Sequence, residues 1–421
     1  MQLSPDSEFR QNFVRTAKWC PDGSTFLAQC ENRSFQFFDT PELSYQDFPA
    51  HSEKDGERLP GRVFTQASPI VDFVWYPTAS LINPASFCFL ASVRECPVKL
   101  LDASDGRLRA SYSIVDHRER QIAPHSMAFN LSADRLYCGF EDAIEVFDVS
   151  RPGEGTRLPT TPSKKSKDGL KGIISAVAFL PSQGSDMYAA GSLSPTTANI
   201  AMFCETQGPE PTTYVSGGPP AAVTQIHFNP ARPHIMYAAY RRHAAIYSWD
   251  LRADVTEPVK IYQCGDERGR TNQKLRFDVD LSGRWLSTGD QHGNILMFDL
   301  QDAGLSAEMA DDGTWKEAEE ITPPLVFKAH GDAVGSVGFH PLRPVLLSAS
   351  GSRHFDIGEA SESSESEDSD TEIEEAAPED VPRPRTGRIR LRCPHPVTLD
   401  ASIKLWSFDS ETSISQTEIK V

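Results

Sequence analysis

One short motif occurs seven times in this sequence, at spacings of 49 to 60 residues. The motif is an aromatic or apolar residue, then any residue, then Pro or Leu. Alternating apolar residues precede most copies, as in IVDFVWYP and AVGSVGFHP, and this alternation indicates a strand with one buried face. A repeat of this length is typical of propellers and solenoids. The seven copies are Trp19-Cys20-Pro21, Trp75-Tyr76-Pro77, Phe129-Asn130-Leu131, Phe179-Leu180-Pro181, Phe228-Asn229-Pro230, Val279-Asp280-Leu281 and Phe339-His340-Pro341.

A second marker follows each copy: an apolar residue that ends a strand and usually precedes Asp. It comes 18 to 26 residues after the first marker in six units, and 67 residues after it in the seventh. Another short apolar strand lies between the two markers, such as TFLAQC or VLLSAS. Each unit therefore has three readable strands and a poorly marked fourth. Such a unit cannot bury both faces alone, whereas seven arranged radially bury them and protect their edges.

We therefore predict an all-β fold, a seven-bladed WD-repeat β-propeller that occupies residues 1–421 as a single domain. WD-type endings are present in YSWDLR (247–252) and DASIKLWSF (400–408). The ring could be closed by the N-terminal segment or by EIKV at residues 418–421. We predict the blades at residues 13–50, 70–115, 125–158, 173–216, 222–264, 274–328 and 333–421.

Four residues of the last unit stand where WD-repeat proteins place a buried, hydrogen-bonded tetrad: His330, Ser348, Asp400 and Trp406. The expected role of this tetrad is rigidity, so its Ser, His and Asp are not interpreted as a catalytic triad.

The long offset in the seventh unit marks an insert, which we predict to be disordered over residues 356–398. Eleven of the 59 acidic residues lie in the Ser-rich stretch 359–380. Such a stretch cannot bury enough apolar surface to offset the entropy of ordering it. Three residues with Glu three positions later are candidate phosphorylation sites: Ser364, Ser369 and Thr371. Five arginines follow between residues 383 and 392. The alternative for both stretches is an ordinary solvated loop.

The net charge of −18 does not by itself suggest a nucleic-acid-binding protein. Strands of a blade run alternately up and down, however, so the loop between the second and third strands lies at the same end as the loops that join blades. We call this end the rim. Its basic residues outnumber its acidic ones, as expected for phosphate contacts, although ordinary solubility charge is the alternative. The basic residues expected there include Arg33, Arg94, Arg118, Arg120, His125, Lys171, Arg241, Arg242, His243, Arg268, Arg270, Lys274, His292, Arg353 and His354.

Several segments resemble the telomerase Cajal-body WD-repeat protein family. They include NFVRTAKWCPDG (12–23), HSMAFNLSADRLYCGF (125–140), TNQKLRFDVDLSG (271–283) and FHPLRPVLLSASGSRHF (339–355), and an acidic interruption after the last of them is part of the same pattern. The resemblance implies a nuclear ribonucleoprotein factor that recognises small nuclear, Cajal-body or telomerase RNA and aids its assembly or localisation. We expect it in the nucleus, Cajal-body-like or nucleoplasmic, and a cytoplasmic pool is compatible with this role. Its implied partners are small nuclear RNA or telomerase RNA and their proteins. A chaperonin is a candidate folding partner, and we expect a monomer.

Recognition of an unpaired RNA loop requires groups that stack on bases, read base edges and hold the backbone. Arg241, Arg242 and His243 would do so from blade five, and the amides of Asn272 and Gln273 can read base edges, although these two could instead cap a turn. The remaining candidates for RNA binding are Lys171, Arg268, Arg270, Lys274, Arg353 and His354.

A protein-only scaffold is the alternative function, because Trp249-Asp250-Leu251-Arg252 matches the WDxR pattern of substrate receptors of cullin-type ubiquitin ligases. In that reading Arg252 would face a partner; otherwise it pairs locally. The basic loop 160–171 could serve nuclear import or carry a phosphorylation site at Thr161.

No motif of an enzyme is apparent, since the sequence lacks a phosphate-binding Gly loop, HExxH and GxSxG. We therefore expect no catalysis and no cofactor. The eight cysteines form no CxxC pair, so we expect reduced thiols and no metal site. No apolar signal sequence or membrane-spanning run is apparent, and no membrane association is expected.

Overall fold

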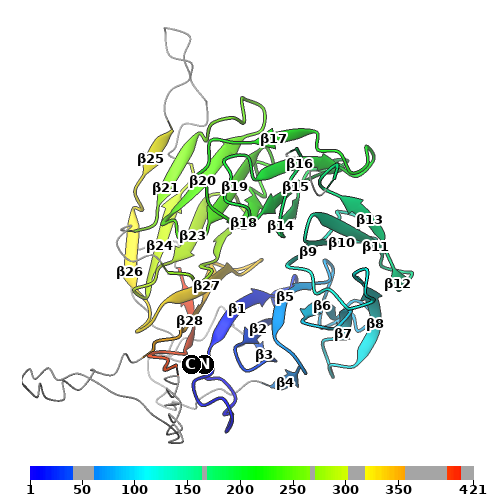
Figure 1. Cartoon of the computed structure of the whole chain (residues 1–421). Coiled ribbons are helices and arrows are strands. Elements are labelled where there is room, and N and C mark those ends of the chain that lie inside the picture. Colours follow the sequence, from blue (N-terminus) through cyan, green and yellow to red (C-terminus); the bar gives the residue numbers. More distant parts are fainter. Residues whose placement is uncertain (41–60, 164–167, 266–270, 302–317, 356–395, 409–421) are drawn as a thin grey trace, which may run out of the picture. The chain divides into compact units, whose positions relative to one another are not determined.

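A computed structural model describes residues 1–40, 61–163, 168–265, 271–301, 318–355 and 396–408. Throughout these residues the regular structure consists of β-strands, without helices. No helix there could cross a membrane. The chain divides into two compact units, Met1–Ser352 with Thr398–Val421 and, separately, Arg353–Val397. The first unit contains the propeller (Figure 1).

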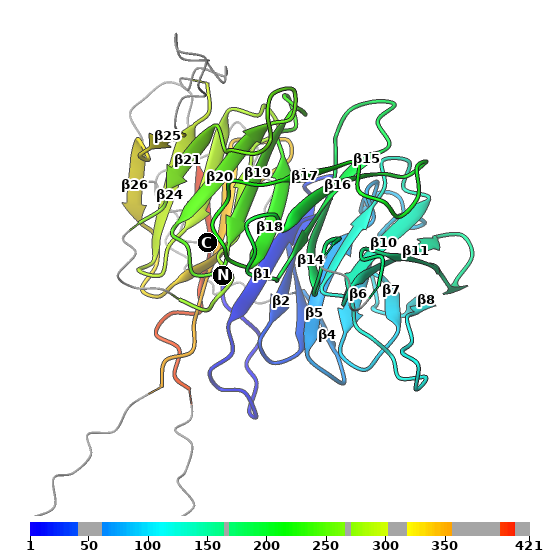
Figure 2. The same cartoon turned by 45° about the horizontal axis from the view of Figure 1, so that its top comes forward.

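Seven antiparallel sheets stand around a central channel (Figures 1 and 2), which confirms the predicted fold class. The first three blades contain β1 (Val14–Trp19), β2 (Thr25–Cys30), β3 (Ser34–Asp39) and β4 (Arg62–Thr65); then β5 (Ile70–Trp75), β6 (Cys88–Val93), β7 (Val98–Asp102) and β8 (Leu108–Ser113); then β9 (Ser126–Phe129), β10 (Arg135–Phe140), β11 (Ala143–Asp148) and β13 (Thr156–Pro159).

The fourth to seventh blades follow in chain order. They contain β14 (Ile174–Phe179), β15 (Met187–Ser192), β16 (Ile200–Cys204) and β17 (Thr213–Val215); then β18 (Val223–Phe228), β19 (Ile235–Tyr240), β20 (Ala245–Asp250) and β21 (Lys260–Gln263); then β22 (Phe277–Val279), β23 (Trp285–Gly289), β24 (Asn294–Asp299) and β26 (Leu325–Lys328); then β27 (Val334–Phe339), β28 (Val345–Ser350) and β29 (Ile403–Ser407).

Two short strands join the outer edges of blades in parallel, a feature that the repeat did not predict. β12 (Gly153–Glu154) pairs with β8 of blade two, although it follows the third strand of blade three. β25 (Glu319–Ile321) pairs with β21 of blade five, although it belongs to the chain of blade six. Each strand thereby ties one blade to its predecessor and covers an exposed edge.

The core consists of seven apolar clusters, one at each interface between neighbouring blades. The cluster between the last and first blades contains Trp19, Phe26, Leu347 and Ile403. At the same interface, the Trp19 indole donates to the Gly338 carbonyl at 3.0 Å. The ring is therefore closed by the same kind of packing that joins its other blades.

The N-terminal segment meets the outer edge of blade seven. The Met1 nitrogen donates to the Ile403 carbonyl at 2.9 Å, and the Ile403 amide donates to the Met1 carbonyl at 3.3 Å. Leu3 packs against the cluster between blades seven and one. The alternative segment, EIKV, lies outside the described residues.

The four tetrad residues form one hydrogen-bonded group in blade seven. The Ser348 hydroxyl lies 2.7 Å from His330 Nε2 and accepts from the Trp406 indole at 2.8 Å. His330 Nδ1 lies 2.9 Å from the Ser402 hydroxyl and 3.5 Å from an Asp400 oxygen. Burial lowers the pKa of His330, so the imidazole is neutral near pH 7 and serves as a hydrogen-bonding bridge.

Among the described cysteines, Cys20, Cys30, Cys88, Cys138 and Cys204 are free and buried, and Cys96 and Cys264 are free and half-buried. Thr161 is only 8% exposed, so phosphorylation there would require the loop to open. The other candidate phosphorylation sites, Ser364, Ser369 and Thr371, lie outside the described residues, as does most of the predicted insert.

Candidate nucleic-acid interface

The loops ahead of blade six and within blade five come together at the rim. Arg242 Nε donates to the Asn272 side-chain oxygen at 2.6 Å, and Arg241 reaches the same oxygen at 3.5 Å. Arg241, Arg242 and Asn272 are all exposed. The Asn272 amide thus holds two guanidinium groups side by side without neutralising their charge.

The turn between β19 and β20 has a strained backbone at Arg242, whose φ is 61°. This left-handed conformation is uncommon for a residue with a Cβ atom and costs about 1 kcal/mol. It orients the Arg242 side chain toward Asn272. The equivalent turn of blade six has a glycine, Gly293, at its left-handed position.

Gln273 connects this site to blade seven. Its side-chain nitrogen donates to the Gly351 carbonyl at 2.8 Å, and its backbone nitrogen donates to the Thr271 hydroxyl at 3.0 Å. Gln273 therefore has structural contacts, as the alternative for this loop expects, whereas Asn272 presents an exposed amide beside two arginines.

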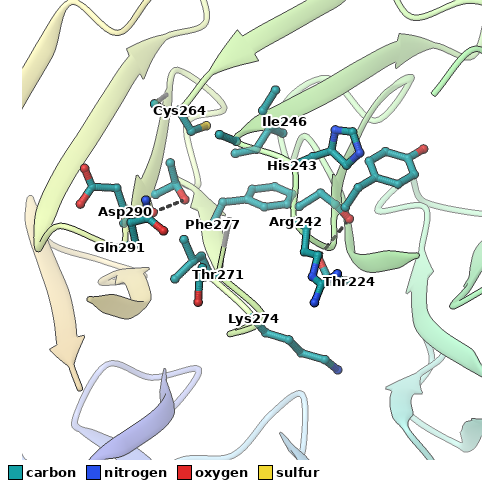
Figure 3. A pocket seen from close by; sticks show the side chains of 18 of the residues that line it. Thr224, Arg242, His243, Ile246, Cys264, Thr271, Lys274, Phe277, Asp290 and Gln291 are labelled. Atoms are coloured by element: carbon teal, nitrogen blue, oxygen red, sulfur yellow. Dashed lines mark hydrogen bonds between the residues drawn. The ribbon is translucent and has the colours of Figure 1, made fainter. Parts of the chain in front are cut away.

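A cavity opens between these loops and the second strand of blade six (Figure 3). It contains about 790 Å³ of empty space, its mouth included. Figure 3 shows Phe277 in the middle of its wall, with Ile246 and Cys264 on one side and Thr271 and Lys274 on the other. We call this cavity the blade-six pocket; it is lined chiefly by Tyr240–Ile246, Cys264, Thr271, Gln273–Leu275, Phe277 and Thr288–His292.

Basic side chains from several blades also gather where the central channel reaches the rim. Burial and the neighbouring charges of Arg276, Arg15 and Arg241 lower the pKa of Lys274 to about 8, against the opposing effect of Asp72. Burial and the charges of Lys274 and Arg94 likewise lower the pKa of His125. We call Arg15, Arg94, His125, Lys274 and Arg276 the mouth cluster. Its mutual repulsion would be relieved by a bound anion.

Acidic partners reduce this positive field but do not cancel it. Arg15 pairs with Glu31 at 3.1 Å, and Asp72, which faces the cluster, pairs with Lys18 at 3.3 Å. Asp290 beside the pocket is engaged in its own turn, where it accepts from the backbone nitrogens of His292 and Asn294 at 2.8 Å.

The structure brings together five of the residues predicted to bind RNA: Arg241, Arg242, Asn272, Gln273 and Lys274. His243 also lines the blade-six pocket. Lys171 lies in another loop at the rim, between blades three and four, where its carbonyl accepts hydrogen bonds from Ser192 and Ser194. Arg268 and Arg270 lie outside the described residues. Arg353 and His354 belong to the second unit, in which His354 forms a bridge with Val397.

Sequence reasoning missed Arg15 and Arg276, because both lie at or beside inner strands rather than in rim loops. Aligning the repeats on their first markers would have found Arg276, which aligns with the third residue of the inner strands. The positions that align with Arg276 include Thr16, Asp72, Ser126, Gln225 and Ser336.

Arg252, the residue on which the scaffold alternative depends, pairs locally. Its guanidinium donates to Asp250 at 2.7 Å and 3.0 Å, and its backbone nitrogen donates to the same carboxylate at 3.0 Å. The WDxR sequence is therefore accounted for by a turn that its own Asp stabilises.

No family model matches the chain. Curated relatives do match, including telomerase Cajal body protein 1 of Mesocricetus auratus, which is 31% identical over 353 residues, or 83% of this chain and 60% of the relative. The Homo sapiens protein of that name is 30% identical over 345 residues, or 82% of this chain and 58% of the relative.

A guanine nucleotide-binding protein negative regulator 1 of Schizosaccharomyces pombe is 27% identical over 66% of this chain and 68% of its own length. The chain spans about 60% of the length of the telomerase Cajal body proteins of Mesocricetus auratus and Rattus norvegicus. The similarity over more than four fifths of the chain and the seven blades agree with the segments noted above: the chain is a homologue of the telomerase Cajal body proteins over the residues that match.

Proposed function

We propose that this protein is a non-catalytic, nuclear ribonucleoprotein factor that binds an unpaired segment of small nuclear or telomerase RNA at its rim. The observation that carries the proposal is the convergence of Arg241, Arg242 and Asn272 beside the mouth cluster. The relatives from Mesocricetus auratus, Rattus norvegicus and Homo sapiens bear names that include telomerase and the Cajal body, which supports the nuclear assignment.

The arrangement suits a single strand better than a duplex. The guanidinium groups of Arg241 and Arg242 offer planar surfaces and several donors, which can stack on bases and hold phosphates. The mouth cluster adds positive charge in a narrow space, where phosphate oxygens are attracted most strongly. The Asn272 amide nitrogen remains on the exposed surface and can read a base edge.

The test is crosslinking of the protein to RNA followed by sequencing, together with affinities for the recovered RNA at several salt concentrations. The double variant R241E/R242E should lose the RNA and flatten the salt dependence by a slope of about two or more. The charge-matched control is R107E/R151E, because these side chains are 70% and 86% exposed in loops at the opposite end. Equal RNA binding by the two double variants would contradict the proposal.

Two other functions predict different partners. A ubiquitin-ligase receptor would copurify with a ligase adaptor and depend on Arg252, which is already paired with Asp250. A regulator of a G protein, suggested by the name of the Schizosaccharomyces pombe relative, would bind that protein without RNA. The charge of the rim favours RNA over both.

A further inference from the structure

Blade six differs from the other blades in its inner strand. β22 pairs with β23 over three residues, Phe277, Asp278 and Val279. The inner strands of the other blades pair over four or five residues. The chain ahead of Phe277 has therefore separated from β23 at the rim, where the other inner strands are still paired or bridged.

The residue that would begin the strand explains this separation. Five residues before the first marker, blades one, two, four, five and seven have Val14, Ile70, Ile174, Val223 and Val334, all at most 3% exposed. Blade six has Lys274 at this position. A lysine cannot occupy that apolar site without a large desolvation cost, so it extends away from Phe277 instead (Figure 3).

The separation leaves the blade-six pocket, and the chemistry of its lining suits a flat heterocycle. Its walls include Phe277, Leu275 and Ile246, and most of its exposed surface is apolar. Thr271 accepts from the Gln273 backbone and keeps its own hydroxyl proton for a ligand. Arg242 and Lys274 both line the pocket, so the phosphate of a bound ligand would meet two cations at its margin.

We propose that the blade-six pocket takes up a single extruded nucleobase of the bound RNA, while Arg242 and Lys274 hold the adjoining phosphates. This inference rests on the proposed function and deepens it, because it specifies one nucleotide subsite. An unpaired base exposes an apolar face and polar edges, which the apolar walls and the Thr271 hydroxyl complement. We infer a nucleobase rather than a peptide side chain, because an apolar wall that suits a base lies beside two cations that suit the adjoining phosphates.

The experiment measures saturation transfer from the full-length protein to nucleoside 5′-monophosphates, and the affinity for short oligouridylate and oligoadenylate. Two variants alter the pocket in different ways. K274V restores the apolar residue of the other blades and removes the cation, whereas A244F fills the pocket from the turn of blade five. The control A85F places the same ring on an exposed loop at the opposite end.

In the natural protein and A85F, transfer to base protons should exceed transfer to ribose protons. Both pocket variants should abolish this difference and weaken oligonucleotide binding by about tenfold, the worth of roughly one stacked base. If A244F and K274V bind oligonucleotides as well as A85F does, the pocket is not a base site, although the proposed RNA binding stands. If the natural protein binds no RNA, the proposed function and the subsite both fail.

Discussion

At the scale of single residues, Arg242 shows how a strained backbone and a ligand-binding side chain can coincide. Its left-handed conformation would suit glycine, as at Gly293 of blade six. Strain of this kind persists where the surrounding structure holds it, and it gathers at functional positions. The hydrogen bond of 2.6 Å to Asn272 is the contact that fixes the guanidinium here.

The variant R242G distinguishes the effect of the Arg242 backbone on stability from the effect of its side chain on RNA binding. Glycine accepts the left-handed conformation without cost, so the free energy of unfolding should stay unchanged or rise by up to about 1 kcal/mol. RNA affinity should fall, because the guanidinium is lost. Urea unfolding and a filter-binding assay measure the two effects, and R242K is the matched comparison that keeps the charge. A variant that loses stability while keeping RNA affinity would refute this assignment.

Lys274 should make RNA binding depend on pH. Burial and the nearby Arg276 lower its pKa to about 8 in the free protein, whereas a bound phosphate would favour the charged amine. Affinity should therefore be greatest below about pH 7 and decline as the pH rises through 8 to 9. The free energy of unfolding should change in the opposite direction and increase as the pH rises above about 8. The unfolded chain keeps the Lys274 proton to higher pH, whereas loss of that proton removes the charge repulsion at Lys274 in the folded protein.

Fluorescence anisotropy with labelled RNA between pH 6.5 and 9 measures this dependence. The variant K274M removes the titrating group while keeping a side chain of similar length. The RNA affinity of K274M should therefore vary little with pH between 6.5 and 9. If K274M keeps the pH profile of the natural protein, the titration belongs to a group other than Lys274.

At the scale of the strand, two buried serines on neighbouring blades offer a direct comparison. Ser348 in β28 is fully buried and joins the His330 imidazole to the Trp406 indole. Ser287 in β23 is also fully buried, but its hydroxyl has no hydrogen-bond partner among the described residues. The same residue type at the same depth therefore has opposite roles in the two blades.

We expect S348A to destabilise the propeller by about 2–4 kcal/mol, because it removes the acceptor of the buried Trp406 indole N–H and the hydrogen-bond partner of the buried His330 Nε2. S287A should be neutral or stabilising by up to about 1 kcal/mol, since it removes an unpaired polar group. The midpoint of urea unfolding tests both variants. If S348A and S287A lose the same free energy of unfolding, the hydrogen bonds of the tetrad contribute nothing to stability beyond packing.

At the scale of the whole molecule, the charge is unevenly distributed along the chain. The net charge is −18, yet eleven acidic residues lie between residues 359 and 380, and five arginines follow between 383 and 392. A polyanionic stretch attached to a protein with a basic rim competes with RNA for the same cations.

Deletion of residues 359–380 should tighten RNA binding, most strongly at low salt, where exposed charges are least screened. The control keeps the length of the segment and replaces its acidic residues with Gln and Asn. Affinities at low and physiological ionic strength measure the effect. If neutralising the segment leaves affinity unchanged at both, the stretch does not compete for the rim.

The sequence by itself determined the blades, because a strand with one buried face imposes a local period that is legible in every repeat. The first markers and the WD-type endings follow from neighbours within a few residues, and the tetrad could be placed by its likeness to the last blade of WD-repeat proteins. It also indicated the rim loops of blades five and six, since alternating strand directions assign each loop to an end. Arg241, Arg242 and Asn272 could be grouped in this way.

Only the tertiary structure decided how residues from different blades meet. Arg15, Arg94, His125 and Arg276 are far apart in the sequence, and their mutual repulsion arises only when the ring closes. The closing contact of Met1 with Ile403 joins residues 402 positions apart, and no local pattern specifies it. The blade-six pocket exists because one lysine cannot fill a site that suits valine, and the space this leaves depends on the packing of the neighbouring blades.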